Sequence, residues 1–220
     1  MAWEIENVKQ TYGCNKAVLK HFREKRGWTQ FEFSKVAGYS QRLISKAESG
    51  RSISSETVLN LAEALSTKEE PLYPEDLICD PLQCAKNYVA AIYSRQQDLM
   101  ALLVPLLDEA VVFQIAGDPQ QIPFAGRFEG IAGVQTLFER FFSILEAPQD
   151  HDHTKCYQFI SEGNNVVVWG DSWIHPIGQP MKTPMPTTNL IKFRRGKIVF
   201  LDDRFDTQAG AEKLLQNQQK

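Results

Sequence analysis

The first half of the chain contains, at residues 28–51, the run WTQFEFSKVAGYSQRLISKAESGR. Thr29 stands three residues before Glu32 and directly ahead of an apolar-periodic stretch, which is the pattern of a capping box at a helix start. The helix that this box begins runs over 30–37 and meets a natural stop at Gly38. The run therefore opens with one short, well-delimited helix.

A second short helix is predicted over 41–49, with Ser40 as its N-cap and Gly50 at its end. At 100° per residue, one face of this helix is apolar and carries Leu43, Ile44 and Ala47. The opposite face is polar and net positive, has no carboxylate, and carries Gln41, Arg42, Ser45, Lys46 and Ser49. In the major groove, Gln can form hydrogen bonds with adenine, and Arg or Lys can form them with guanine. Two helices joined by a short turn have the arrangement of a helix-turn-helix.

Residues 28–40, 44–51 and 55–65 together resemble the Cro/C1-type (XRE family) helix-turn-helix, an all-α, lambda-repressor-like domain. The resemblance implies that Gln30 contacts a phosphate and that Arg51 approaches the DNA backbone. It places the second helix in the major groove, so the expected DNA-binding residues are Gln30, Ser40, Gln41, Arg42, Ser45, Lys46 and Arg51. Phe31 departs from the family pattern, because the family is usually polar there. A helical bundle that contacts another protein is the alternative reading of this segment.

The charge of the chain is unevenly distributed. The 220 residues include 24 Lys and Arg against 27 Asp and Glu, which gives a formal net charge of −3 and argues, read alone, against a nucleic-acid binder. Residues 16–52, however, hold nine basic residues against three Glu, while residues 53–80 hold one Lys against seven acids. The bulk charge therefore hides a basic block that coincides with the two predicted helices.

The length predicts two domains. Residues 1–14 read as an N-terminal extension, residues 15–81 as the helix-turn-helix domain with its linker, and residues 82–220 as a second domain. The polar, acidic stretch over 66–76 carries two prolines and is typical of a linker or late turn.

The second domain is predicted to be α+β, with helices first and a meander of strands after them. Helices are expected over 83–93, 99–106 and 130–146, and strands over 110–115, 154–161, 165–175, 182–194 and 197–206, with a loop at 117–126. This order, with the pieces at 123–130, 165–170, 196–198 and 204–206, resembles the SnoaL-like branch of the nuclear transport factor 2-like superfamily. The resemblance implies a cone-shaped, cystatin-like domain in which helices pack on a curved antiparallel sheet. It also implies a pocket for a small apolar molecule and a sheet face that forms a homodimer.

Candidate pocket residues follow in part from the same resemblance, by analogy with isomerases and cyclases that place a base and hydrogen-bond donors around a carbonyl compound: Tyr88, Asp118, Asn189 and Asp206. Trp169 and Trp173 are candidates because they alternate on one strand, and Phe113 and Phe205 complete the set. Asp118 and Asp206 are the candidate catalytic acids. Five of these residues also have a plainer reading: Tyr88 as a packing residue, Asp118 as a turn residue, Asp206 as a cap, and the two Trp as part of a dimer face.

No metal and no cofactor are expected, because His151, His153 and Cys156 do not form a standard zinc pattern. The first residues show no signal peptide, and four dispersed cysteines do not suggest a disulfide scaffold, so a cytoplasmic location is expected. The sequence thus predicts a DNA-binding transcriptional regulator whose second domain dimerises, senses a small apolar molecule, or does both. The alternative is an isomerase or cyclase with an accessory helix-turn-helix.

Overall fold

The computed structural model describes residues 10–94, 99–148, 152–179 and 183–218. Contacts divide the chain into two compact units, with the first unit's main segment ending at Asp80 and the second unit's beginning at Pro81. None of the described helices is long and apolar enough to cross a membrane.

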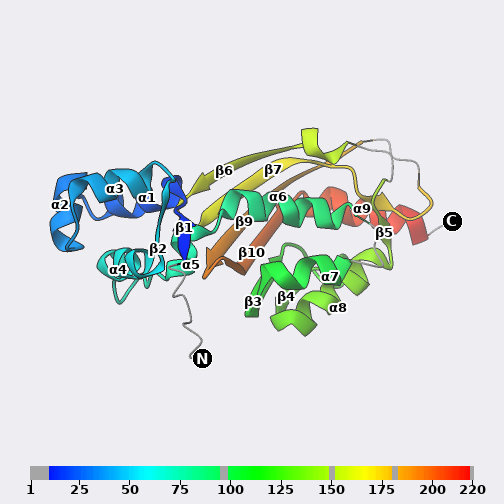
Figure 1. Ribbon diagram of the computed structural model, residues 1–220. Coiled ribbons are helices and arrows are strands. Elements are labelled where there is room, and N and C mark those ends of the chain that lie inside the picture. Colours follow the sequence, from blue (N-terminus) through cyan, green and yellow to red (C-terminus); the bar gives the residue numbers. More distant parts are fainter. Residues whose placement is uncertain (1–9, 95–98, 149–151, 180–182, 219–220) are drawn as a thin grey trace, which may run out of the picture. The chain divides into compact units, whose positions relative to one another are not determined.

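The first unit consists of five helices and one short ladder (Figure 1). The helices are α1 (Lys16–Lys25), α2 (Gln30–Val36), α3 (Gln41–Glu48), α4 (Ser55–Leu65) and α5 (Pro74–Ile78). Strands β1 (Thr11–Gly13) and β2 (Ser52–Ser54) pair antiparallel. Helices α2 and α3 lie where they were predicted, whereas α5 begins inside the stretch that was expected to be a linker or late turn. The ladder is an addition to the all-α expectation and ties the segment before α1 to the start of α4.

Local signals in the sequence set the ends of these helices as predicted. The capping box at α2 is present: the Thr29 N–H donates to Glu32 Oε2 at 2.7 Å, and the Glu32 N–H donates to Thr29 Oγ1 at 3.2 Å. Ser40 caps α3, and both Gly38 and Gly50 adopt positive φ, at 72° and 78°. The turn between α2 and α3 is therefore fixed by chemistry within a few residues.

One apolar core holds the first unit together. Leu19, Phe33, Ile44 and Leu61, one from each of the first four helices, are fully buried. Trp28 stacks on Phe33 with ring centroids 5.9 Å apart. Because α3 buries Ile44 and Ala47 in this core, its opposite face is left to solvent.

The second unit combines helices with a six-stranded sheet. Its helical segments are α6 (Pro81–Ile92), α7 (Leu99–Leu103), η2 (Val104–Leu106), α8 (Gly130–Phe142), η3 (His153–Lys155) and α9 (Thr207–Gln218). The sheet has the order β4 (Gly126–Glu129), β3 (Leu107–Ile115), β10 (Lys197–Phe205), β9 (Met185–Arg194), β7 (Asn165–Ser172) and β6 (Tyr157–Glu162). A separate pair joins β5 (Leu145–Glu146) to β8 (His175–Pro176).

Helices α6 and α8 run along the sheet and share its buried core (Figure 1). On β7, Val166 and Val168 are buried in this core, so the alternate side chains of that strand lie on the other face. The domain class, helices packed on a curved sheet, is the one predicted.

Several details differ from the prediction. Strands β3 and β10 pair in parallel, so the sheet is mixed rather than purely antiparallel. The C-terminal helix α9 and the strand β4 were not foreseen, and the predicted helix over 130–146 ends at Phe142. Partner strands that lie far apart in sequence cannot be identified from periodicity, which encodes only the local conformation.

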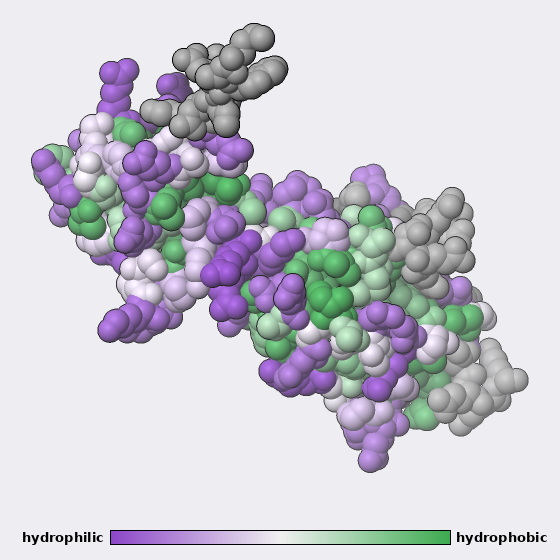
Figure 2. Space-filling model, turned by 60° about the horizontal axis from the view of Figure 1, so that its bottom comes forward, coloured by the Kyte–Doolittle hydropathy of each residue, from purple (hydrophilic) through white to green (hydrophobic). Residues whose placement is uncertain are grey.

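The surface in Figure 2 is divided into hydrophilic areas and smaller hydrophobic ones. Among described residues of the first unit, the large exposed hydrophobic side chains are Phe31, Val36 and Leu59. The Lys35 ammonium lies 5.1 Å from the centre of the Phe31 ring, a cation–π contact that partly covers this exposed ring.

Candidate functional site

The exposed face of α3 is polar and basic. Gln41, Arg42, Ser45 and Lys46 are all exposed, on the side of the helix opposite the buried Ile44. A helix held by one apolar face and presenting long donor side chains on the other can enter a major groove and reach base edges.

The other predicted DNA-binding residues flank this face. Ser40 is exposed and its Oγ accepts the Leu43 N–H at 3.3 Å, so its role in the structure is that of a helix cap. Arg51 is exposed just after α3. Gln30 begins α2, where its Nε2 donates to Glu48 Oε2 at 2.8 Å. An amide nitrogen has two hydrogens, so the second remains for a phosphate oxygen.

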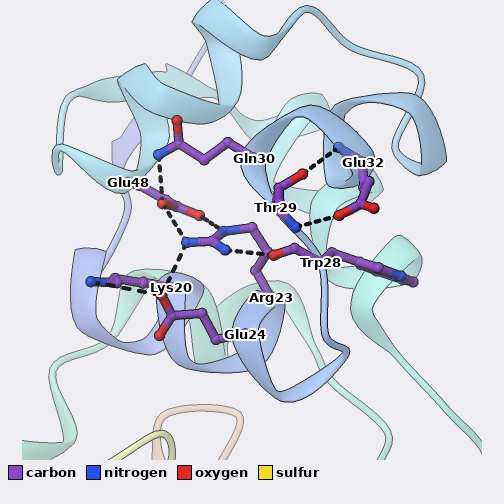
Figure 3. A network of polar contacts seen from close by, with 8 residues as sticks. All are labelled: Lys20, Arg23, Glu24, Trp28, Thr29, Gln30, Glu32 and Glu48. Carbon is purple, nitrogen blue, oxygen red and sulfur yellow. Dashed lines mark hydrogen bonds and ion pairs between the residues drawn. The ribbon is translucent and has the colours of Figure 1, made fainter.

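A buried ion pair holds the three helices that position this face (Figure 3). Arg23 of α1 donates to both oxygens of Glu48 in α3, from Nε to Oε1 at 2.5 Å and from Nη2 to Oε2 at 3.2 Å. Its Nη1 donates to the Trp28 carbonyl at 2.6 Å. The Arg23 and Glu48 side chains are only 8% and 6% exposed. The hydrogen bond from Glu48, its charge and that of Glu24 raise the pKa of Arg23, although burial opposes them.

The ion pairs of the first unit leave the α3 face charged. Glu70, from the acidic block, pairs with Lys25 at 2.5 Å and with Arg26 at 3.1 Å, on the far end of α1. Among described residues, Arg42, Lys46 and Arg51 form no ion pair, so their charges stay available. Glu70 therefore neutralises the C-terminal end of α1 and not the face that is predicted to meet DNA.

The second unit contains a cavity of about 150 Å³ between its helices and the sheet. Apolar side chains form most of its wall, with Val89 of α6, Phe138 of α8 and Phe205 of β10 among them. Polar side chains also reach it: Tyr88, Tyr93, Tyr157, Ser172, Thr187, Asn189 and Asp203. An apolar cavity with a few converging polar groups is typical of a small-molecule site.

Asp203 is the carboxyl group of this cavity, and sequence analysis did not identify it. Its Oδ1 accepts hydrogen bonds from Thr187 Oγ1 at 3.0 Å and from Asn189 Nδ2 at 2.6 Å. Burial raises the pKa of Asp203 to about 6, in spite of these two hydrogen bonds. A carboxyl group that titrates near neutral pH inside a cavity can act as a hydrogen-bond acceptor or as a general base.

Tyr88 reaches the same cavity from α6. Its side chain is 4% exposed and its ring lies edge-on to Phe113, with centroids 6.0 Å apart. Burial, and after it the negative charge of Asp203, raise the pKa of Tyr88 well above its ordinary value. The phenol is therefore a neutral donor next to a carboxyl group.

A cluster of three hydroxyl groups lies elsewhere in the cavity wall. The Tyr93 hydroxyl is 2.8 Å from the Tyr157 hydroxyl and 3.4 Å from Ser172 Oγ, and it accepts the Trp173 N–H at 3.3 Å. Burial raises the pKa of Tyr157. These hydroxyl groups satisfy one another, so they need no ligand.

The structure separates the predicted pocket residues into two groups. Tyr88, Asn189 and Phe205 line the cavity, and Phe113 is buried behind Tyr88. Asp118 and Asp206 are exposed instead: Asp118 Oδ1 accepts the Gln120 N–H at 2.9 Å, and Asp206 Oδ1 accepts the Ala209 N–H at 3.0 Å. They are a turn residue and a helix cap, outside the cavity.

Trp169 and Trp173 also lie outside the cavity. They line a shallow polar depression together with Gln158, Asp171, Thr188 and Arg204. Since Val168 is buried in the core, Trp169 belongs to the opposite face of β7. Among the described residues, no group of three or more His, Cys, Asp or Glu side chains is placed to hold a metal ion. His151 lies outside the described residues.

Comparison with known proteins identifies both units. Residues 19–72 match the helix-turn-helix family model. No curated protein matches the sequence.

Solved structures resemble the second unit. An NTF2-like protein from Burkholderia xenovorans covers 61% of this chain and 95% of its own length, with 21% identity and a TM-score of 0.50. An NTF2-like protein from Burkholderia pseudomallei covers 61% and 96%, with 17% identity and a TM-score of 0.51. TerC, co-crystallised with polyporic acid, covers 61% and 98%, with 16% identity and a TM-score of 0.50. The chain thus joins a helix-turn-helix domain at residues 19–72 to a domain with the NTF2-like fold.

Proposed function

We propose that this protein is a transcriptional regulator of the XRE type, which reads an operator with α3 and binds a small apolar molecule in the cavity of its second unit. The observation that carries the proposal is the α3 face, where four exposed polar side chains stand without any carboxylate or ion pair among the described residues. The helix-turn-helix match at residues 19–72 supports it.

In this proposal, some of the residues contact DNA bases and others contact the phosphate backbone. Arg42 and Lys46 are placed to reach base edges, because they lie on the exposed face one turn apart. Gln30 and Arg51 lie at either end of the face and suit phosphate contacts, which fix the register of the protein on the duplex but carry no sequence information.

The test begins with selection of operator sequences from a random duplex library by the full-length protein, at a fixed salt concentration. Arg42→Ala should weaken binding to the selected sequence by about 5- to 150-fold and relax the base preference at one position. Lys68→Ala is the matched control, because Lys68 is exposed in the same unit but far along the chain from α3. Equal affinity of wild type and Arg42→Ala for the selected operator would refute the proposal.

A homodimer completes this proposal, since one helix-turn-helix reads a half-site and paired half-sites lie about 34–36 Å apart. The depression with Trp169 and Trp173 is the surface that we assign to the dimer, because two Trp side chains and Arg204 are enriched types at interfaces. Trp169→Glu should convert the dimer to a monomer in analytical ultracentrifugation and abolish the preference for paired half-sites. A wild-type monomer at micromolar concentration would contradict the assignment.

A second candidate function rests on Asp203. A buried carboxyl group with a pKa raised to about 6 is a suitable base for proton abstraction next to a carbonyl, as an isomerase or cyclase requires. In this case Asp203→Asn would abolish turnover of a carbonyl substrate, while Asp118→Asn and Asp206→Asn would leave it unchanged. DNA binding would be unaffected by all three variants.

A further inference from the structure

Two polar groups that face the cavity have no hydrogen-bond partner among the described residues. Asp203 uses Oδ1 for both of its hydrogen bonds, from Thr187 and Asn189, so Oδ2 accepts none. The Tyr88 hydroxyl, on a side chain that is 96% buried, makes none either. Both residues line the same cavity, whereas its other hydroxyl groups, those of Tyr93, Tyr157 and Ser172, are paired with one another.

Both groups are therefore available to a molecule in the cavity. Buried polar side chains in folded proteins are nearly always paired within the protein, so two groups that are left for the cavity contents point to a ligand or to water. The two groups are also complementary, because the phenol can donate its hydrogen and the ionised carboxylate oxygen can only accept one.

A hydroxyl has the chemistry that suits both groups, which line one cavity and interact electrostatically. It can donate its hydrogen to Asp203 Oδ2 and accept the Tyr88 hydrogen on its oxygen, whereas a carbonyl offers no hydrogen and a carboxylate would repel Asp203. We propose that the cavity binds an alcohol or phenol, held by its hydroxyl between Tyr88 and Asp203, with an apolar ring against the remaining wall. This assignment rests on the proposed function, which places a small apolar molecule in the cavity. A cavity of about 150 Å³ accommodates a single ring of about the size of benzene.

The preference for a hydroxyl depends on the ionisation of Asp203. Above a pH of about 6 its carboxylate accepts a hydrogen from an alcohol, and below that pH the protonated carboxyl becomes a donor that suits a ketone. The other titratable groups that act on Asp203 or line the cavity with it are Tyr88 from α6, Tyr93 just after α6, Tyr157 from β6, His175 from β8, Asp202 from its own strand and Lys213 from α9.

The experiment compares ligands that differ in one group. Calorimetric titrations of the full-length protein with phenol and toluene, and with cyclohexanol and cyclohexanone, separate the hydroxyl from the ring. At pH 8 phenol should bind at least about tenfold more tightly than toluene, because one of its two hydrogen bonds is to a charged group. At pH 8 the affinity for cyclohexanol should exceed the affinity for cyclohexanone, and the difference between the two affinities should be smaller at pH 5.

Variants assign the effect to the two residues. Tyr88→Phe should lower the affinity for phenol to nearly that for toluene, and it should leave the affinity for toluene unchanged. Asp203→Asn puts an amide donor at the position of Oδ2, so it should reverse the order of cyclohexanol and cyclohexanone. Asp202→Asn is the matched control at pH 8, where Asp203 is ionised with or without it: Asp202 accepts a hydrogen bond from Arg204 and does not line the cavity, so the variant should leave all four affinities at this pH as they are.

The outcomes of these titrations test the hydroxyl ligand and the ligand-binding function of the second unit separately. Equal binding of phenol and toluene would overturn the hydroxyl assignment, since a water molecule would then satisfy the two groups, but would leave a ligand cavity. Absence of binding by all four compounds would overturn the hydroxyl assignment together with the ligand-binding part of the proposed function.

Discussion

Removal of one partner of the buried Arg23–Glu48 pair should unfold the first unit. In Glu48→Leu the guanidinium keeps its hydrogen bond to the Trp28 carbonyl and a longer one, at 3.4 Å, to the exposed Glu24. It loses the two hydrogen bonds to Glu48, and it remains inside the unit with the side chain only 8% exposed. Gln30 loses its acceptor as well. Breaking a buried pair in this way costs about 3–5 kcal/mol of folding free energy.

That cost is comparable to the whole stability of a domain of this size, about 4–10 kcal/mol. For a small domain each 1 kcal/mol lowers Tm by about 4–8 °C, so the variant should lose at least about 12 °C. Arg23→Met should be destabilised to a similar degree, since it leaves the Glu48 carboxylate without its cation.

The double variant Arg23→Met/Glu48→Leu separates the pair from the two isolated charges. With both ions replaced by apolar side chains, neither is buried unpaired, so its stability should lie close to that of the wild type or above it. The destabilisation of the double variant should therefore be several kcal/mol smaller than the sum of the destabilisations of the two single variants.

Hydrogen exchange read by mass spectrometry is the suitable assay, because it reports each unit separately in the full chain. Peptides within residues 16–65 should lose protection in both single variants and recover it in the double variant, while peptides within residues 107–115 stay unchanged. A cost below about 1 kcal/mol for Glu48→Leu, or a double variant as unstable as the singles, would refute the reasoning.

Three further changes have direct expectations. Thr29→Ala removes one half of the capping box and should lower the stability of the first unit by about 1 kcal/mol, measured by the same exchange assay. Asp203 should make the second unit more stable at low pH: its folded pKa of about 6 lies above the ordinary value of 3.8, so this contribution is complete below pH 4 and is lost as the pH rises through 6. In urea unfolding, the free energy of unfolding of Asp203→Asn relative to that of the wild type should accordingly rise by about 2–3 kcal/mol between pH 4 and pH 7.5. Gly170→Ala should destabilise the second unit severely in urea unfolding, because its Cβ would stand 2.0 Å from the Cys156 carbonyl oxygen.

The first unit could be read from its sequence because its determinants are local. Caps, stop glycines and helix faces depend on residues a few positions apart, and Thr29, Gly38 and Ser40 carry these signals. The pairing of Arg23 with Glu48 joins residues 25 positions apart and could not be read in the same way.

The cavity could be predicted only in part, because it depends on strand register. In β10 the register shifts between Ile198 and Phe200, so strict alternation from Ile198 would have turned Asp202 inward. The irregularity brings Leu201 and then Asp203 to the inner face instead. A bulge leaves no mark in the alternation pattern, so that pattern does not single out Asp203. Asp118 and Asp206 were expected from the family resemblance instead, and neither reaches the cavity.

The two units manage buried polar groups in opposite ways. In the first unit, Arg23, Glu48 and Gln30 satisfy one another, which fixes the three helices that present α3 to solvent. In the second unit, Tyr88 and one oxygen of Asp203 have no partner among the described side chains and face a cavity. Substitution of Tyr88 by Phe should therefore leave the stability of the unliganded protein nearly unchanged while it weakens binding of a hydroxyl compound. A polar group that the fold does not use and that matters only to a ligand is the expected signature of a binding site rather than of a packing residue.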